Sequence, residues 1–331
     1  MAGRRQKKSG GRSYAWRYRG RIVACVFIEV IIICALVIMI GWNKGVKEWF
    51  EQFEQPVLKE VDISGINSPN AILMQARGGK ILGEINGEAQ IYPASMTKIM
   101  TVILGIENFD DLDEKITLTN EMFTGLYEQD ATQAGFQPGE EVRVIDLLYG
   151  VMLPSGAECC IALADTISGS EADFAELMNK KARKLGMENT HFCDSTGLHN
   201  PDHYSTVKDI AVLMKYCIKN DTFREIVETS RHSTGVTNIH PDGITYYSTM
   251  FKNLSDPTVT GGKILGGKTG YTSEAGHCLV SFAEIEGREY IFVSAGASGA
   301  DGNTIPHIQD AVTVYNRVGA AIEAKMNNNN K

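Results

Sequence analysis

Strand-like segments lie towards both ends of the chain, and helical segments fill the region between them. The strand-like segments are short apolar runs near glycine: 71–76, 80–84, the residues before Tyr92, 277–284 and 289–295. The segments with helical spacing are 142–152, 158–167, 174–185, 206–219 and 305–325. Residues 110–140 are polar and irregular, and Glu286-Gly287-Arg288 is typical of a hairpin turn. This order predicts an α+β fold, in which an antiparallel sheet joins the two ends, helices flank it, and the middle forms a helical subdomain.

A basic tract and a long apolar run precede this region. Residues 1–21 hold eight Arg and Lys residues and no acid, whereas the whole chain has a net charge of −8. The remainder is therefore acidic, which argues against nucleic-acid binding. Residues 22–42 have about the length that spans a bilayer as a helix, roughly 20 residues. Positive charges before this run, and none within it, predict a cytoplasmic N-terminus. Glu29 is unfavourable in a membrane unless it is protonated or paired.

We therefore predict a single-pass protein of the cell membrane with its main domain outside the cytoplasm. The predicted parts are a basic cytoplasmic tail (1–21), a transmembrane anchor (22–42), a juxtamembrane stalk (43–60), the folded domain (61–325) and a disordered tail (326–331). The alternative for the apolar run is a cleaved signal peptide. The lack of an Ala-x-Ala-like site near residues 38–45 disfavours it.

The seven cysteines indicate neither a disulfide framework nor a zinc site. Cys25 and Cys34 fall in the apolar run, and the other five lack framework or metal-ligand spacing. Cys159 and Cys160 lie in an apolar helical segment, so we expect them in the core. We expect no metal ion and no cofactor.

The segment Tyr92–Lys98 carries the first candidate catalytic residues. It runs into an apolar helical pattern, and its proline suits a helix entry. Ser95 and Lys98 are three residues apart, so on a helix they share one face. A hydroxyl beside an amine at a helix start can act as a nucleophile and its base. An N-capping serine with a solvated lysine is the alternative, and Ser205–Lys208 repeats the spacing, so other motifs must decide.

Two later segments supply companions for such a site. Lys268-Thr269-Gly270-Tyr271 lies just ahead of the C-terminal hairpin, and glycines there allow a strand edge to approach a ligand closely. A lysine and a hydroxyl in that position can hold a carboxylate, although a surface turn has the same composition. Ser155 lies between two helical segments, in a turn that contains proline and glycine.

Together these motifs resemble those of the D-alanyl-D-alanine carboxypeptidases, the low-molecular-weight penicillin-binding proteins. The resemblance covers roughly residues 61–320 and implies a β-lactamase/DD-peptidase-like fold. The matching segments are Pro93–Lys98, Leu153–Gly156, Asp194–Leu198, Tyr204–Thr206, Gly267–Thr272 and Ala275-Gly276. The resemblance implies a penicillin-sensitive serine hydrolase that trims the terminal D-alanine from peptidoglycan stem peptides of the cell wall. The implied partners are a stem peptide that ends in D-Ala-D-Ala and β-lactams as covalent inhibitors.

The resemblance also implies a catalytic role for three side chains. Ser95 would attack the carbonyl between the last two D-alanines and form an acyl-enzyme, while Lys98, in its neutral form, would accept its proton. Ser155 would relay a proton to the departing D-alanine. By the same resemblance, the Ser205–Lys208 repeat belongs to a structural helix start.

Substrate binding is expected at the Lys-Thr-Gly strand. Lys268 and Thr269 would hold the terminal carboxylate of the substrate, beside Gly270. The backbone N–H groups of Ser95 and Tyr271 would form the oxyanion hole, a device whose single donors are worth roughly 10²–10³ in rate.

Three departures from the family pattern stand out. The second motif usually reads Ser-x-Asn, but here Ala157 replaces the Asn and Glu158 follows, so weaker activity is conceivable. No arginine that aids carboxylate binding in some relatives aligns before Lys-Thr-Gly, and Lys252 or Lys263 could replace it. The β-rich second domain and terminal amphipathic anchor common in the family are not expected here, so the apolar run 22–42 would provide anchoring.

Three other functions remain open. A penicillin sensor or scaffold would be acylated but would release no D-alanine. A β-lactamase of the commonest class needs a Glu-x-x-x-Asn loop, whereas Glu176–Asn179 has a different spacing and lies in a helical run. A zinc carboxypeptidase could use His199 and His203, but without a third ligand these fit histidines of the substrate rim or the surface.

Overall fold

The computed structural model describes Val30 and residues 58–254, 256–299 and 305–329. The predictions for the cytoplasmic tail, the membrane anchor and most of the stalk fall outside these described residues. Within the described residues, no helix combines the length and the apolar character that a membrane crossing requires.

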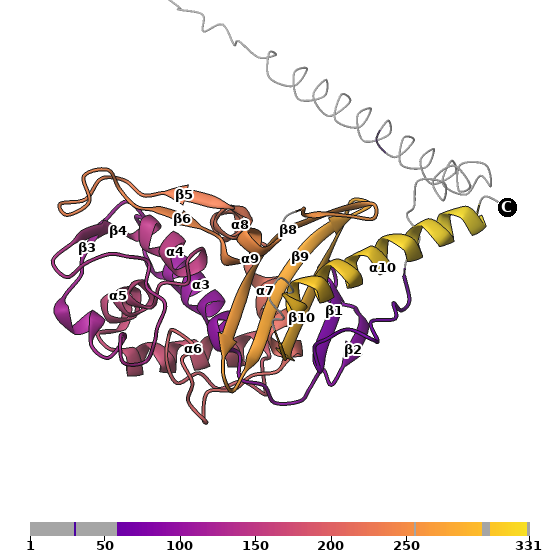
Figure 1. Cartoon of the computed structure of the whole chain (residues 1–331), viewed down its shortest axis with the longest axis horizontal. Helices are drawn as coiled ribbons and strands as arrows, with labels where there is room; N and C mark the ends of the chain where they lie inside the picture. Colours follow the sequence, from indigo (N-terminus) through magenta and orange to yellow (C-terminus); the bar gives the residue numbers. More distant parts are fainter. Residues whose placement is uncertain (1–29, 31–57, 255, 300–304, 330–331) are drawn as a thin grey trace, which may run out of the picture. The chain divides into compact units, whose positions relative to one another are not determined.

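A six-stranded antiparallel sheet forms the centre of the domain, with the strand order β2-β1-β10-β9-β8-β7 (Figure 1). The strands are β1 (Asn70–Gln75), β2 (Ile81–Ile85), β7 (Thr258–Val259), β8 (Gly262–Thr272), β9 (Gly276–Ile285) and β10 (Arg288–Ala297). β1 pairs with β10 along its whole length, from Asn70 opposite Ala295 to Gln75 opposite Tyr290. Early and late parts of the chain therefore meet inside one sheet, which confirms the predicted α+β fold.

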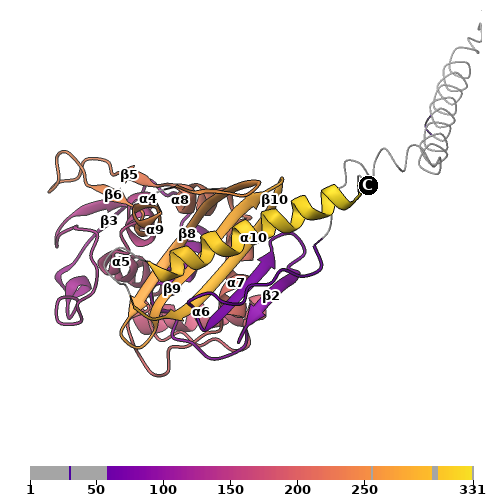
Figure 2. The same ribbon diagram turned by 45° about the vertical axis from the view of Figure 1, so that its right-hand side comes forward.

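Helix α10 (Pro306–Asn329) covers one face of this sheet (Figure 2). Its buried face packs with Leu73 of β1 and Phe292 of β10 in one apolar cluster. Tyr315 belongs to this cluster, and its hydroxyl lies 3.1 Å from both Ser281 Oγ and the backbone nitrogen of Phe292. The polar end of the ring is thus satisfied inside the layer, as a buried tyrosine requires.

The other helices pack on the opposite face of the sheet. Side chains alternate along a strand, so Ile72 and Met74 belong to the cluster on this side while Leu73 faces α10. The elements here are η1 (Ala94–Thr97), α3 (Lys98–Asn108), α4 (Val144–Met152), α5 (Ala157–Ser168), α6 (Glu171–Leu185), α7 (Val207–Cys217) and α8 (Asp221–Glu228). The exception is the short helix α9 (Thr249–Asn253), whose Met250 belongs to the cluster that includes α10. The five longer helices among those predicted, α10 included, are confirmed with ends that differ by a few residues. The prediction of a disordered tail at 326–331 is wrong for residues 326–329, which continue α10.

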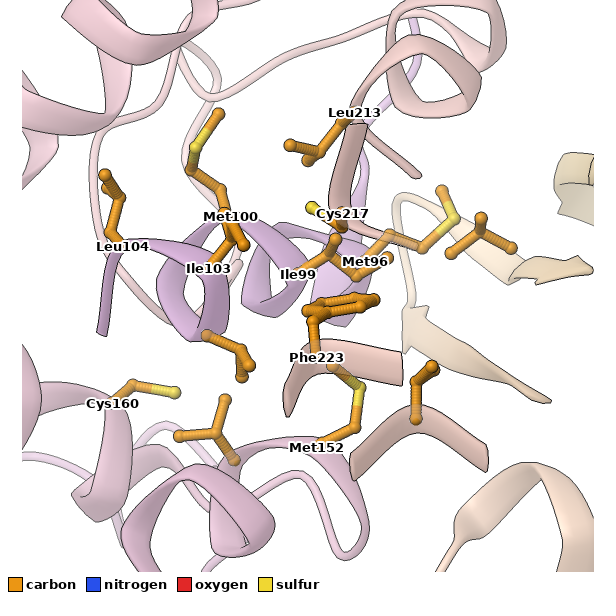
Figure 3. Packing of buried hydrophobic residues seen from close by; sticks show 14 of the residues in the cluster. Met96, Ile99, Met100, Ile103, Leu104, Met152, Cys160, Leu213, Cys217 and Phe223 are labelled. Carbon is orange, nitrogen blue, oxygen red and sulfur yellow. The ribbon is translucent and has the colours of Figure 1, made fainter. Parts of the chain in front are cut away.

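Helix α3 lies in the middle of this helical layer. All of its residues from Lys98 to Gly105 are buried, which matches a helix that is apolar on all sides. Figure 3 shows its side chains meeting Met152 and Cys160 on one side and Leu213 and Cys217 on another. Cys160 is fully buried, as predicted. The start of α3 is therefore held by the core from several directions.

Some local predictions differ from the structure. The residues before Tyr92 form no strand but a single bridge between Ile91 and Ser205, because the 3-10 helix η1 begins directly after Pro93. The irregular region 110–140 contains η2 (Asn120–Phe123) and β3, which pairs with β4. The two small sheets that the sequence did not predict are β3 (Lys115–Thr117) with β4 (Glu141–Arg143), and β5 (Arg231–Ser233) with β6 (Thr245–Tyr247).

Candidate active site

Ser95 and Lys98 lie at the junction of η1 and α3. Ala94 has a φ of 47°, a left-handed conformation that is costly for a residue with a side chain and that recurs at functional sites. Lys98 is buried, and its Nζ donates hydrogen bonds to Ser95 Oγ at 3.2 Å and to the Thr196 carbonyl at 2.6 Å. The amine is within reach of the hydroxyl, as a nucleophile and its base require.

Ser155 reaches the same hydroxyl from the turn between α4 and α5. Its φ is 75°, and its Oγ donates a hydrogen bond to Ser95 Oγ at 3.1 Å. The Gly156 N–H donates to the Gly150 carbonyl, so the turn folds back on α4 and fixes the serine. The structure thus brings together two predicted catalytic residues that are 60 positions apart.

Lys268 extends this array from strand β8. Its Nζ donates to Ser155 Oγ at 3.0 Å and to the Thr269 carbonyl at 2.9 Å. Burial, and then repulsion from Lys98, lower the pKa of Lys268 well below the usual lysine value. The hydroxyl of Thr269 lies 2.7 Å from that of Thr249 on α9, a partner that the sequence did not reveal. The site therefore has two amines and two serine hydroxyls in one hydrogen-bonded row.

Gly270 brings β8 against the segment that carries Ser95. A Cβ atom at position 270 would lie 2.9 Å from the backbone nitrogen of Ser95 and 3.1 Å from the Cβ of Ala94. The next residue, Tyr271, leaves its side chain exposed beside this contact. Gly270 therefore allows β8 to lie directly against residues 94 and 95, the segment that carries the candidate nucleophile.

For the acylation by penicillin that the family resemblance implies, a Gly270→Ala chain should react about tenfold more slowly, because the added methyl group pushes β8 away from Ser95 by a few tenths of an ångström. The measurement is the second-order rate of covalent labelling. Gly87→Ala is a matched control, since its Cβ would also meet an atom at 2.9 Å, but that atom belongs to the flexible side chain of Glu84. Equal rates for both variants would contradict the expectation.

The family assignment follows from comparison with known proteins. The family described as D-alanyl-D-alanine carboxypeptidase (Peptidase_S11) matches residues 57–299, which is more than half of the chain. The chain belongs to that family.

Several D-alanyl-D-alanine carboxypeptidases are close in sequence. DacF of Bacillus subtilis is 35% identical over 233 residues, covering 69% of this chain and 57% of DacF. The D-alanyl-D-alanine carboxypeptidase of Streptomyces strain K15 is 35% identical over 236 residues, covering 69% of this chain and 78% of that protein. DacC of Escherichia coli is 33% identical over 262 residues, covering 72% of this chain and 58% of DacC. The chain thus spans less than two thirds of the length of DacF and DacC.

Solved structures share the fold. The Streptomyces K15 DD-transpeptidase superposes with a TM-score of 0.69 at 29% identity, over 79% of this chain and 100% of that chain. The D-alanyl-D-alanine carboxypeptidase of Mycobacterium tuberculosis gives a TM-score of 0.69 at 22% identity, over 81% of this chain and 96% of that chain. These matches confirm the predicted DD-peptidase-like architecture.

In this member of the D-alanyl-D-alanine carboxypeptidase family, Ala157 stands where the second motif usually has Asn. The neighbouring Glu158 does not replace the hydrogen-bond donor that the Asn would supply. That side chain is buried, and its Oε1 accepts the backbone N–H groups of Ala134 and Gly135 at 2.6 and 2.9 Å. Burial raises the pKa of Glu158. Glu158 therefore holds the preceding loop, and Ala157 leaves the usual amide position without a polar group.

The other candidate residues have structural positions. Lys252 and Lys263, the suggested replacements for the family's arginine, are both exposed. Thr206 caps α7 by accepting the Asp209 N–H, so the Ser205–Lys208 repeat is a helix start, as predicted. Asn179 lies on α6 and exchanges hydrogen bonds with the backbone of Phe192.

The two histidines considered as zinc ligands differ from each other. His199 lies partly exposed beside Tyr92 and Glu274, whereas His203 is buried. The expectation of a rim or surface position was therefore wrong for His203. Across the described ranges, no group of three or more His, Cys, Asp and Glu residues is placed to hold a metal ion.

Residues 194–197 support Lys98, although sequence reasoning gave them no role. One carboxylate oxygen of Asp194 accepts three hydrogen bonds at 2.7 Å, from the backbone nitrogens of Thr196 and Gly197 and from the Thr196 hydroxyl. This turn presents the Thr196 carbonyl to Lys98 and the Ser195 carbonyl to a threonine of α3. Asp-Ser-Thr-Gly is typical of such a side-chain-capped turn, and that was the available signal.

Asp194 should make stability depend on pH in the acid range. Burial raises its pKa, but hydrogen bonds from His203, Thr196 and Gly197 outweigh this and lower the pKa from 3.8 to about 2. A carboxylate with a lowered pKa stabilises the fold above the unfolded-state value, and this contribution is lost as pH falls from about 4 towards 2. The full contribution corresponds to about 2 kcal/mol.

Urea unfolding of the wild type and of Asp194→Asn across this pH range measures the effect. The difference in free energy of unfolding between the two proteins should be largest above pH of about 5 and should shrink as pH falls. A difference that stays constant down to pH of about 2 would refute the assignment.

Proposed function

We propose that this protein is a serine-type D-Ala-D-Ala carboxypeptidase that removes the terminal D-alanine from peptidoglycan stem peptides and is inhibited covalently by penicillins. One observation carries the proposal: Ser95 Oγ lies 3.2 Å from Lys98 Nζ and 3.1 Å from Ser155 Oγ, and Ser155 in turn lies 3.0 Å from Lys268 Nζ. A nucleophile, a base, a proton relay and a cation for the substrate carboxylate are thus adjacent.

Acylation uses these groups in sequence. The terminal carboxylate of the substrate binds at Lys268 and the Thr269 hydroxyl. Its negative charge favours the protonated form of Lys268, which burial otherwise disfavours. Ser95 Oγ attacks the carbonyl carbon between the two D-alanines while neutral Lys98 takes the hydroxyl proton. The oxyanion forms next to the backbone N–H groups of Ser95 and Tyr271.

Collapse of the tetrahedral intermediate breaks the C–N bond. The hydroxyl of Ser155 donates its proton to the leaving amine and takes a proton from Lys268, to which it is hydrogen-bonded. As D-alanine leaves, Lys98 releases to solvent the proton that it took from Ser95 and Lys268 regains one, so both lysines return to their starting states. A water molecule then attacks the ester on Ser95, with Lys98 again accepting a proton, and the shortened peptide leaves.

Release of free D-alanine tests this function. The full-length protein in detergent is incubated with a peptide that ends in D-Ala-D-Ala, with and without penicillin, and a peptide ending in L-Ala-L-Ala is the control. We expect D-alanine from the first peptide only, and none after penicillin treatment. A protein that releases no D-alanine and takes no covalent penicillin would exclude the proposal.

A penicillin-binding sensor or scaffold is the second candidate, and Ala157 is the observation that favours it. Without the usual Asn amide, the substrate amide loses a donor, while the acylating row of Ser95, Lys98 and Ser155 stays complete. Such a protein would take a covalent penicillin label but would release no D-alanine. The same assay, combined with labelling, distinguishes the two functions.

We further propose that the folded domain works on the outer side of the cell membrane, anchored by residues 22–42. The support is the basic tract 1–21 before a long apolar run. Protease added to cells without an outer wall should remove the catalytic domain and spare an N-terminal tag. Removal of the tag with protection of the domain would reverse the orientation.

A further inference from the structure

His203 connects the nucleophile segment to the turn that supports the catalytic lysine. It is 2% exposed. Its Nε2 lies 2.9 Å from Thr97 Oγ1, and its Nδ1 lies 3.3 Å from Asp194 Oδ2. Thr97 stands between Ser95 and Lys98 in the sequence. A buried Asp194–His203–Thr97 chain therefore ends at the residue next to the catalytic lysine.

The tautomer of His203 follows from its neighbours. Two groups compete for Nδ1, which lies 3.3 Å from Asp194 Oδ2 and accepts the backbone N–H of Cys193 at 3.3 Å if it carries no proton. We assign the Nδ1 proton to the carboxylate contact, because a hydrogen bond to a charged acceptor is the stronger of the two. A neutral imidazole has one donor and one acceptor nitrogen. Nε2 is then the acceptor, and the Thr97 hydroxyl donates to it.

Thr97 does not use its hydroxyl as residues at its position usually do. It precedes the first residue of α3, where threonine side chains commonly accept a backbone N–H, but no such side-chain cap forms here. Instead its hydroxyl bonds to His203. Gly197 packs directly beneath this contact, because a Cβ atom there would collide with the Ala94 carbonyl and lie 2.8 Å from Thr97 Oγ1.

The contacts among these residues form a closed series. Lys98 Nζ donates to the Thr196 carbonyl at 2.6 Å, Thr196 donates its backbone N–H to Asp194 at 2.7 Å, and Asp194 accepts from His203, which meets Thr97. Thr97 and Lys98 are adjacent in the sequence, so the series of contacts ends beside the residue at which it began. One imidazole thus fixes the distance between the catalytic lysine's backbone and the carbonyl that orients its amine.

We propose that His203 is a positioning residue for the acylation step, acting through the hydrogen bond between its Nε2 and Thr97. The proposal rests on the proposed function of Ser95 and Lys98. His203 itself touches neither substrate nor reacting atoms. Its effect is to hold Lys98 Nζ in line with Ser95 Oγ, and misplacement of such a pair by about 1 Å can cost roughly 100-fold in rate.

Two substitutions of His203 distinguish its contact with Thr97 from its contact with Asp194. His203→Gln places an amide group where Nε2 was and can keep the Thr97 contact. His203→Asn places one where Nδ1 was and can keep only the Asp194 contact. We expect penicillin acylation to fall about 10- to 100-fold in His203→Asn and to stay within about threefold of wild type in His203→Gln. Thermal unfolding, measured on both variants, separates a rate effect from loss of the fold.

A double-mutant cycle with Thr97→Val tests the link itself. Thr97→Val alone should slow acylation as much as His203→Asn, and the two together should cause no further loss. His240→Asn and His240→Gln form a matched control pair, because His240 also bonds to a buried carboxylate, Glu140, at 2.7 Å. Neither should change the acylation rate.

Equal acylation rates for His203→Gln and His203→Asn, or additive losses in the cycle, would overturn the proposal. A readout that needs no activity is the ¹⁵N NMR spectrum of the histidine rings. It should show Nδ1 protonated and Nε2 unprotonated in His203, with the Nε2 signal shifted by Thr97→Val. An Nε2 signal that Thr97→Val leaves unmoved would overturn the positioning role even if the protein proved unreactive, whereas an unreactive wild type whose Nε2 signal does move would count against the proposed function alone.

Discussion

A Ser95→Ala chain should release no D-alanine and should take no covalent penicillin label. The Oγ of Ser95 is the atom that both Lys98 and Ser155 contact, and its removal takes the proposed nucleophile away from its base. The loss in D-alanine release should be at least about 10⁴-fold, the scale on which serine hydrolases lose activity when their nucleophile is removed. The measurements are D-alanine release and gel detection of a fluorescent penicillin.

Ser205→Ala is the matched control for this experiment. Ser205 also stands three residues before a lysine, but its hydroxyl lies 2.8 Å from that of Thr190, at the start of α7. This variant should keep its penicillin labelling and lose about 1 kcal/mol of stability, the usual value of one hydrogen bond. Labelling that survives in Ser95→Ala would show that the nucleophile lies elsewhere.

Lys98→Arg should be almost as inactive as Lys98→Met, although arginine keeps the positive charge. The proposed role of Lys98 is to accept a proton, which arginine cannot do because it stays protonated in proteins. Loss of a general base costs roughly 10²–10⁴-fold in rate. The measurement is the rate of penicillin acylation, with the free energy of unfolding recorded for each variant because Lys98 is buried.

The control for these variants is Lys208→Arg. Lys208 lies in the second Ser-x-x-Lys segment, and its amine pairs with Glu88 at the surface, so the substitution should leave acylation unchanged. If Lys98→Arg were acylated at close to the wild-type rate, Lys98 would act as a fixed charge and the base would have to be another group.

Apolar periodicity predicted helices such as α6 and α7 well because each has one buried stripe. The prediction placed a helix at 174–185, and α6 spans Glu171–Leu185; the difference arises because Ser170 caps the helix by accepting the Asp173 N–H. β8 was harder to predict because its four glycines have no side chain to contribute to an alternating pattern. The short pairs β3–β4 and β5–β6 were missed because three-residue strands carry too few side chains to show a period.

Within the site, sequence motifs identified the residues whose side chains form the hydrogen-bonded row. Ser95, Lys98, Ser155 and Lys268 were all predicted, and the structure brings them into one row. Motifs did not reveal backbone contributions, such as the Thr196 carbonyl that orients Lys98. They also could not reveal that a histidine on a polar loop is buried, because that depends on how the loop packs against the nucleophile segment.

The pairing of β1 with β10 has a consequence for when the protein first becomes reactive. Ser95 is made early, but β1 finds its neighbour only when Ala295 and the rest of β10 exist to lie beside Asn70, and Lys268 sits two strands further across. Pairings between such distant segments form late. A truncated chain that ends before β10 should therefore not react with a β-lactam. During synthesis, the moment at which a fluorescent β-lactam begins to label the chain would report when the last strand docks.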